Sequence, residues 1–122
     1  MTKLYCDTSN LKDIQNCLTK FKIDGVTTNP SIMRNEGVRN YKEHCKKILN
    51  LTKNKPLSVE VFADKDYEII NQAQIISKWS KSIYVKVPVI NTKGKFLKKV
   101  IKNLNESNIK INITAIFTLR QL

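Results

Sequence analysis

The sequence contains little glycine and no long apolar run, and these absences exclude several classes of protein. It has three glycines in 122 residues. None forms a GxGxxG or GxxxxGK loop after an expected strand, so we predict neither a dinucleotide site nor a P-loop. No apolar run approaches the ~20 residues that a membrane span needs, and the first residues lack the apolar block of a secretory signal. We therefore expect a cytoplasmic protein without a membrane partner.

Cysteines are few and form no motif. Cys6, Cys17 and Cys45 are odd in number and contain no CxxC pair, so neither a disulfide framework nor a zinc site is predicted. Cys17 and Cys45 fall on apolar stripes at helical spacing, where a free cysteine behaves as a small hydrophobic residue. We expect three buried thiols and no metal site.

The net charge of +12 raises the question of a nucleic-acid partner. The lysines are spread over every expected helix and loop, and the three arginines are Arg34, Arg39 and Arg120. Few side chains can therefore make bidentate phosphate contacts, and no aromatic residues alternate with the basic ones. This pattern favours a solvated, lysine-rich exterior over a nucleic-acid-binding surface.

Apolar patterns typical of strands and helices alternate along the chain. Strands are expected near residues 4–6, 25–28, 57–62, 82–90 and 109–117, with helical patterns over 11–21, 41–49, 69–79 and 96–104. Pro30 is well placed as the first residue of a further short helix. Ser9 or Asn10 is expected to cap the first helix, and Asp64 or Asp66 the helix after the third strand.

Strands separated by helices predict repeated βαβ units, hence one α/β domain over residues 1–122 with a parallel sheet. A closed (β/α)₈ TIM barrel needs about 250 residues, so this chain supplies about five of the eight units. It could be a fragment, the product of a shortened gene, or a chain that closes a barrel with other copies of itself. An open, flavodoxin-like sheet is the remaining possibility.

Polar side chains occur near the C-terminal end of all five expected strands, although strands of an all-parallel sheet are usually apolar. In strand order they are Asp7, Thr27 and Asn29, Glu60, Lys86, and Asn112 with Thr114. Side chains alternate along a strand, so Asn112 and Thr114 share one face. The C-terminal ends of barrel strands are where catalytic groups lie.

Lys86, within the apolar stretch "SIYVKVPVI", is the most informative of these residues. A buried ammonium is unfavourable by several kcal/mol unless it is paired. Lys86 should therefore pair with Glu60 or Asp7, or lose its proton. A neutral lysine amine attacks carbonyl carbon and forms a Schiff base.

Structural roles remain open for several of these residues. Lys86 and Glu60 could form a structural salt bridge, Asn29 could cap the helix that begins at Pro30, and Asp7 could cap the first helix. Thr114 could simply satisfy strand propensity. We interpret His44, which lies beside apolar helical positions, as a packing or surface residue.

Five motifs resemble the transaldolase family, including its short-form members and the related fructose-6-phosphate aldolases. They are "YCDTSNL" at 5–11, "DGVTTNPSI" at 24–32, "LSVEVF" at 57–62, "YVKVPV" at 84–89 and "INITAIFTLRQ" at 111–121. The resemblance covers essentially the whole chain. It implies a (β/α)₈ barrel whose last three units are absent here.

The resemblance also implies a role for each polar residue. Lys86 would be the Schiff-base lysine and Asp7 the general acid/base at the cleaved carbon–carbon bond. Glu60 would relay protons through a water beside Thr114. Asn29 and Asn112 would hold the hydroxyls of the dihydroxyacetone portion, and Thr27 would line the pocket.

The implied activity is transfer of a dihydroxyacetone unit from a ketose phosphate to an aldose phosphate, in the pentose phosphate pathway, with no metal or organic cofactor. Glu60 favours the transaldolase branch, because the aldolase branch usually carries glutamine at that position. The alternatives are an aldolase of the fructose-6-phosphate type and a non-catalytic half-barrel that acts as an assembly piece. The expected partners are sugar phosphates and other copies of the chain.

Overall fold

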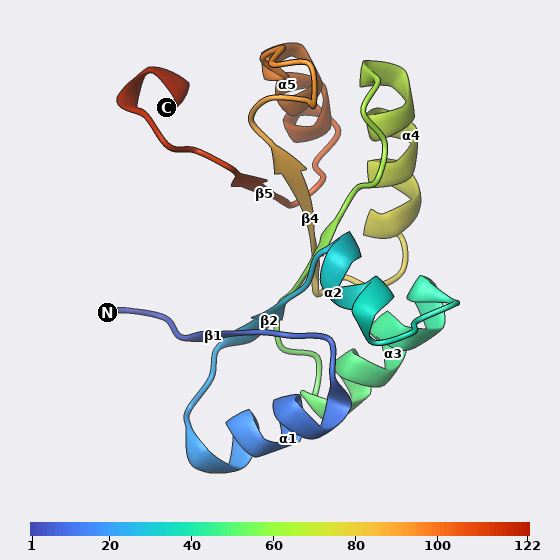
Figure 1. Cartoon of the computed structure of the whole chain (residues 1–122), viewed down its shortest axis with the longest axis vertical. Helices are drawn as coiled ribbons and strands as arrows, with labels where there is room; N and C mark the ends of the chain where they lie inside the picture. Colours follow the sequence, from blue (N-terminus) through green and yellow to red (C-terminus); the bar gives the residue numbers. More distant parts are fainter.

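The computed structural model describes all 122 residues, as five strands alternating with helices (Figure 1). The elements are β1 (Tyr5–Asp7), α1 (Leu11–Lys20), β2 (Gly25–Thr27), α2 (Pro30–Asn35), α3 (Tyr41–Leu51), β3 (Leu57–Glu60), α4 (Asp66–Ser77), β4 (Ile83–Pro88), α5 (Lys98–Glu106), β5 (Ile111–Thr114) and the 3₁₀ helix η1 (Leu119–Gln121). None of these helices is both long and apolar enough to cross a membrane.

The five strands form one sheet in the order β1-β2-β3-β4-β5, and every neighbouring pair is parallel. This confirms the α/β prediction. Figure 1 shows α2, α3 and α4 along one side of the curved sheet and both chain termini on the other side. β1 and β5 are the two edge strands.

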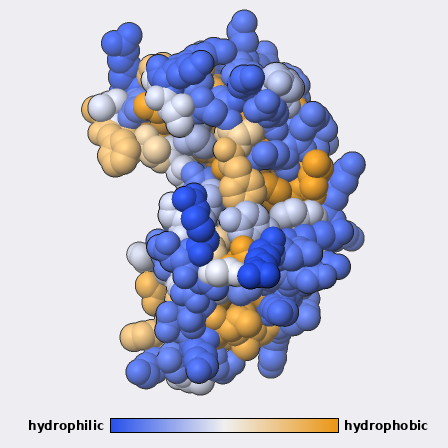
Figure 2. Space-filling view, turned by 45° about the vertical axis from the view of Figure 1, so that its right-hand side comes forward, coloured by the Kyte–Doolittle hydropathy of each residue, from blue (hydrophilic) through white to orange (hydrophobic).

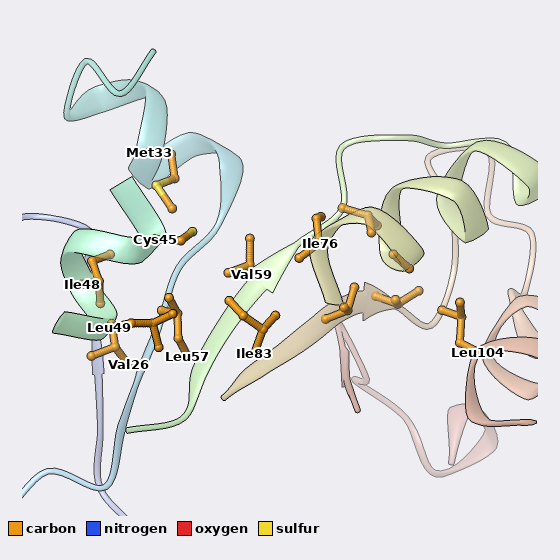
Figure 3. Close-up of a cluster of buried hydrophobic side chains, with 14 of the residues drawn as sticks. Val26, Met33, Cys45, Ile48, Leu49, Leu57, Val59, Ile76, Ile83 and Leu104 are labelled. Atoms are coloured by element: carbon orange, nitrogen blue, oxygen red, sulfur yellow. The ribbon is translucent and has the colours of Figure 1, made fainter. Parts of the chain in front are cut away.

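The hydrophobic core lies between the sheet and the helices (Figure 3). Val26, Leu57 and Val85 of the strands are fully buried, because alternate strand residues point toward the helical layer. Ile48 of α3 and Leu104 of α5 close the core from the helical side and are likewise fully buried. Helices therefore cover one face of the sheet.

Helix starts follow local capping chemistry. The side chain of Asn10 accepts hydrogen bonds from the backbone N–H groups of Lys12 and Asp13, which confirms one of the two predicted caps of α1. The predicted cap of α4 was wrong, because the N-cap position is Lys65 and makes no side-chain bond. Asp64 instead accepts hydrogen bonds from the backbone N–H and the hydroxyl of Thr92, and these bonds hold the pKa of its carboxyl below the usual value.

Two boundaries near the C-terminus differ from the sequence prediction. Strand β5 ends at Thr114, earlier than predicted, because Ala115 has a positive φ of 59° that interrupts extended backbone. Helix α5 begins only at Lys98. Phe96, predicted to lie in that helix, instead forms an antiparallel bridge with Ile90 and is exposed.

Gly25 provides a direct test of how β1 is held against the sheet. Its Cα faces the ring of Tyr5, and an added Cβ would lie 2.6 Å from the carbonyl oxygen of Pro56. We expect Gly25→Ala to destabilise the protein by about 1–3 kcal/mol, as other overpacked substitutions do. Chemical denaturation measures this, with Lys22→Ala at an exposed position of the same connection as the control, expected to change stability by less than about 0.5 kcal/mol. Equal stabilities of the two variants would contradict the packing described here.

Candidate functional site

The predicted site residues of the strands gather on the face of the sheet that carries no helices. Asp7 is the register partner of Thr27, and Thr27 is the partner of Ser58. Two residues further along, Glu60 is the partner of Lys86, and Lys86 is the partner of Asn112. Since register partners and residues two apart share a face, both rows lie on the same side of the sheet. Figure 2 shows the molecule hollowed on one side.

The Lys86 side chain is enclosed although it lies on this open face. Its Nζ donates a hydrogen bond to the carbonyl oxygen of Thr28 at 3.0 Å and lies 3.7 Å from Oε2 of Glu60. The side chains of Lys86 and Glu60 are 13% and 22% exposed. The sequence left Glu60 and Asp7 open as partners of Lys86, and in the structure the partner is Glu60. No ion pair links Lys86 to Asp7, which instead accepts a hydrogen bond from Thr27.

Asp7 and Thr27 form a second polar contact on the same face. Oγ1 of Thr27 donates a hydrogen bond to Oδ1 of Asp7 at 2.7 Å, between the edge strand β1 and its neighbour β2. Asp7 is exposed, and its second oxygen accepts no hydrogen bond within the chain. The predicted alternative of Asp7 as the cap of α1 is wrong, because Asn10 has that role.

Asn112 reaches across the open face to the third strand. Its Nδ2 donates a hydrogen bond to Oγ of Ser58 at 3.2 Å. Thr27, Ser58 and Asn112 line a hollow of about 460 Å³, together with Tyr5, Pro56, Tyr84 and Ile111. Because Ser58 and Tyr84 precede Glu60 and Lys86 on their strands, the hollow lies on the N-terminal side of the Lys86–Glu60 pair.

Asn29 lies at the end of β2 and begins the next helix. Its side-chain oxygen accepts a hydrogen bond from the backbone N–H of Ile32 at 2.9 Å, and Pro30 occupies the first turn of α2. The capping role considered for Asn29 is confirmed. Its Nδ2 makes no hydrogen bond within the chain and remains available as a donor.

Two further residues have less central positions. Thr114 is the register partner of Pro88, two residues beyond Asn112 on the same face, and it makes no side-chain hydrogen bond to the other predicted residues. His44 lies away from this group, with Nε2 2.7 Å from the carbonyl oxygen of Ser9. It therefore packs α3 against the loop after β1, as predicted for a structural histidine.

Sequence reasoning missed two contributors to the site. Ser58 lies two residues before Glu60, and the same alternation that selected Glu60 would have placed Ser58 on its face. The contribution of Thr28 is a backbone carbonyl, which has no signature in the sequence. Thr28 itself is fully buried, and its hydroxyl donates to the carbonyl oxygen of Ser58 at 2.9 Å.

The arrangement combines an enclosed amine, two carboxylates and amide and hydroxyl donors. An amine of this kind can attack a carbonyl carbon once it loses a proton, and a nearby carboxylate can accept or return protons. No group of three or more histidine, cysteine, aspartate or glutamate side chains is arranged to hold a metal ion. The chemistry that these residues offer is covalent and acid–base.

Comparison with known proteins agrees with this geometry. Residues 4–122 match the family model described as Transaldolase/Fructose-6-phosphate aldolase. The protein named probable transaldolase in Dictyoglomus turgidum is 38% identical over 119 residues, and those of Lactiplantibacillus plantarum and Dehalococcoides mccartyi are 37% and 30% identical over the same length. Each alignment covers 98% of this chain and 52% or 53% of the relative.

The chain thus spans about half the length of the curated relatives it matches. The order of its strands and helices is that of consecutive βα units in a TIM barrel, the fold of the matching family. The family match extends over nearly every residue, including all seven predicted site residues. On these grounds the chain belongs to the transaldolase/fructose-6-phosphate aldolase family and forms part of a TIM barrel.

Proposed function

We propose that this chain acts in transaldolase-type transfer, moving a dihydroxyacetone unit from a ketose phosphate to an aldose phosphate through a Schiff base on Lys86. The observation that carries the proposal is the enclosed Lys86 amine, held by the Thr28 carbonyl and by Glu60. By similarity to the family, we also propose a cytoplasmic place in the pentose phosphate pathway.

The first step needs Lys86 to give up a proton. Glu60 is the nearest carboxylate, and a separation of 3.7 Å exceeds a direct hydrogen bond, so a bridging water would carry the proton. Thr114, on the same face, would help to hold that water. The free amine then attacks the ketose carbonyl carbon, and loss of water leaves an iminium ion.

Carbon–carbon cleavage follows from the iminium ion. Asp7 takes the proton of the hydroxyl next to the bond that breaks, and the bonding electrons flow into the iminium as the aldose product leaves. The retained enamine then attacks the aldehyde carbon of an acceptor, and hydrolysis frees Lys86. The exposed carboxylate of Asp7, oriented by the Thr27 hydroxyl, suits a base that must meet substrate from the open face.

Substrate hydroxyls would be held by amides on either side of Lys86. Asn29 has a free Nδ2 fixed by its helix-capping bond, and Asn112 is oriented by Ser58. Thr27 and Ser58 would form the wall of the hollow beside Asn112, on the N-terminal side of Lys86. Such an arrangement gives hydrogen bonds to a short polyhydroxylated chain without any cofactor.

Trapping the covalent intermediate tests the role of Lys86. Incubation of the full chain with fructose 6-phosphate and borohydride should add a stable mass to Lys86, located by peptide mass spectrometry, because borohydride reduces an iminium to a stable amine. Lys110→Ala is a matched control, since Lys110 precedes β5 and lies near Tyr84 but contacts no proposed catalytic group. The adduct should persist in Lys110→Ala and vanish in Lys86→Ala. A wild-type chain that forms no adduct in its assembled state would rule out this mechanism.

Transaldolase and aldolase chemistry differ in their need for an acceptor. The presence of Glu60 favours transfer, so product from fructose 6-phosphate should form much faster when an aldose phosphate acceptor such as erythrose 4-phosphate is supplied. A coupled assay with and without the acceptor measures this ratio. Equal rates in the two assays would instead assign the chain to aldolase-type cleavage.

We further propose that the chain works as a homo-oligomer, because its open sheet edges are flanked by exposed apolar side chains. Leu4 and Tyr5 lie beside or within β1, and Ile113, Phe117 and Leu119 lie within or beyond β5. Edge strands with unpaired backbone groups and apolar neighbours favour association. Joining such edges would also cover the face that holds Lys86.

Sedimentation tests this association. The full chain should sediment as a defined oligomer, and Phe117→Asp should shift it toward monomer, because a carboxylate would replace an apolar ring that is 86% exposed. Phe21→Asp, at an exposed phenylalanine at the end of α1, is the control and should leave the oligomer unchanged. A monomer that also fails to form the Lys86 adduct would support a non-catalytic assembly piece instead.

A further inference from the structure

Two thiols meet between the edge strand β1 and the helix α1. Cys6 lies in the middle of β1 and points toward the helical layer, where it is 8% exposed. Cys17 lies in α1 and is half-buried. Their Sγ atoms are 2.8 Å apart. The third thiol, Cys45 of α3, is fully buried and makes no side-chain contact with either of them through sulfur.

The distance between the sulfur atoms of Cys6 and Cys17 approaches the length of a disulfide bond. A disulfide has a sulfur–sulfur length of about 2.03–2.05 Å, so the two atoms would need to approach by less than about 1 Å. Cys6 belongs to β1 and Cys17 to α1, the next element along the chain, and the two sulfurs already lie in contact. A sulfur pair at this distance differs from an isolated cysteine, because each thiol has its reaction partner already in place.

We propose that Cys6 and Cys17 form a site of reversible oxidative modification, in which hydrogen peroxide converts the two thiols to an intramolecular disulfide. Cys17 reacts first, because its side chain is partly exposed. Its sulfur attacks one peroxide oxygen, the O–O bond breaks, and water leaves, so Cys17 becomes a sulfenic acid. The sulfur of Cys6 then displaces the hydroxyl group from Cys17, which departs as water with the proton of Cys6. With hydrogen peroxide, two thiols are oxidised and one peroxide is reduced to two waters.

The environments of the three thiols support this division of roles. Burial, followed by the contact with Cys17, raises the pKa of the Cys6 thiol to about 12. Burial alone raises the pKa of Cys45 to about 12. Both therefore stay protonated and slow to react with peroxide near neutral pH. Cys6 still captures oxidised Cys17 because it is in contact with it, whereas Cys45 has no such partner.

The bond would change how the first strand is held. β1 has three residues and pairs with the sheet on one side only. A disulfide at Cys6 would fix this strand to α1 one residue before Asp7. The modification site thus lies next to the proposed active site, although its chemistry is independent of the proposed transfer reaction.

Mass spectrometry of the native full chain tests the site. Reduced protein is treated with a small excess of hydrogen peroxide, blocked with iodoacetamide after unfolding, and digested. We expect loss of two hydrogen masses, a crosslink between the peptides that contain Cys6 and Cys17, and full alkylation of Cys45. Dithiothreitol should restore all three thiols. The oxidised form should also unfold at a temperature several degrees higher, because the crosslink restricts the unfolded chain.

Two variants and one change of conditions make the result specific. Cys45→Ser should form the same crosslink as the wild type, and Cys17→Ser should form none. Oxidation in concentrated urea should give mixed pairs that include Cys45, because the native contact is then lost. The proposal is overturned if native protein accumulates sulfinic acid on Cys17 while Cys6 stays free, or if Cys45 joins the crosslinks without denaturant.

Discussion

Helices cover only one face of this parallel sheet, and the position of every polar group of interest follows from that constraint. Side chains alternate along each strand. The neighbours of the buried residues Val26, Leu57 and Val85 on their strands therefore point away from the core. In a sheet covered on both sides, polar residues there would need partners to offset desolvation. Here Asp7 is exposed and hydrated, and the open face tolerates a cluster of polar groups. The alternation of side-chain direction along the strands therefore places apolar residues in the core and polar residues on the open face.

Lys86 departs from the rest of that face because its amine is enclosed even without a second layer. The long side chain leaves β4, and its Nζ reaches the carbonyl at the end of β2 while Glu60 lies on the strand between them. A carbonyl and a carboxylate both stabilise the ammonium form. In the structure the Lys86 side chain is thus held by both groups, and the proposed reaction would begin with proton transfer from its amine. In that proposal Glu60, 3.7 Å from the amine, would accept the proton through a water.

Much of this could be predicted from the sequence, because strand and helix periods and strand-end polar residues are local signals. The α/β class, the pairing of Lys86 with Glu60 and the Asn29 cap all have such signals. The bridge between Ile90 and Phe96 could not be predicted, because it depends on a turn at Gly94 with a φ of 76°. Asp64 was mistaken for a helix cap since its real partner, Thr92, lies 28 residues away. All seven predicted site residues lie within the part of the chain that matches the family model. Their catalytic roles remain predictions.

The cap of α2 links helix formation to the geometry of the open face. Asn29 uses its side-chain oxygen to begin the helix, so its amide nitrogen can point in only one direction. A free asparagine could rotate and exchange donor for acceptor, but this one cannot without releasing the first turn of α2. The direction in which this amide donor points is therefore set by the folding of a six-residue helix. If Asn29 binds substrate as proposed, the amide would need no adjustment when the ligand arrives.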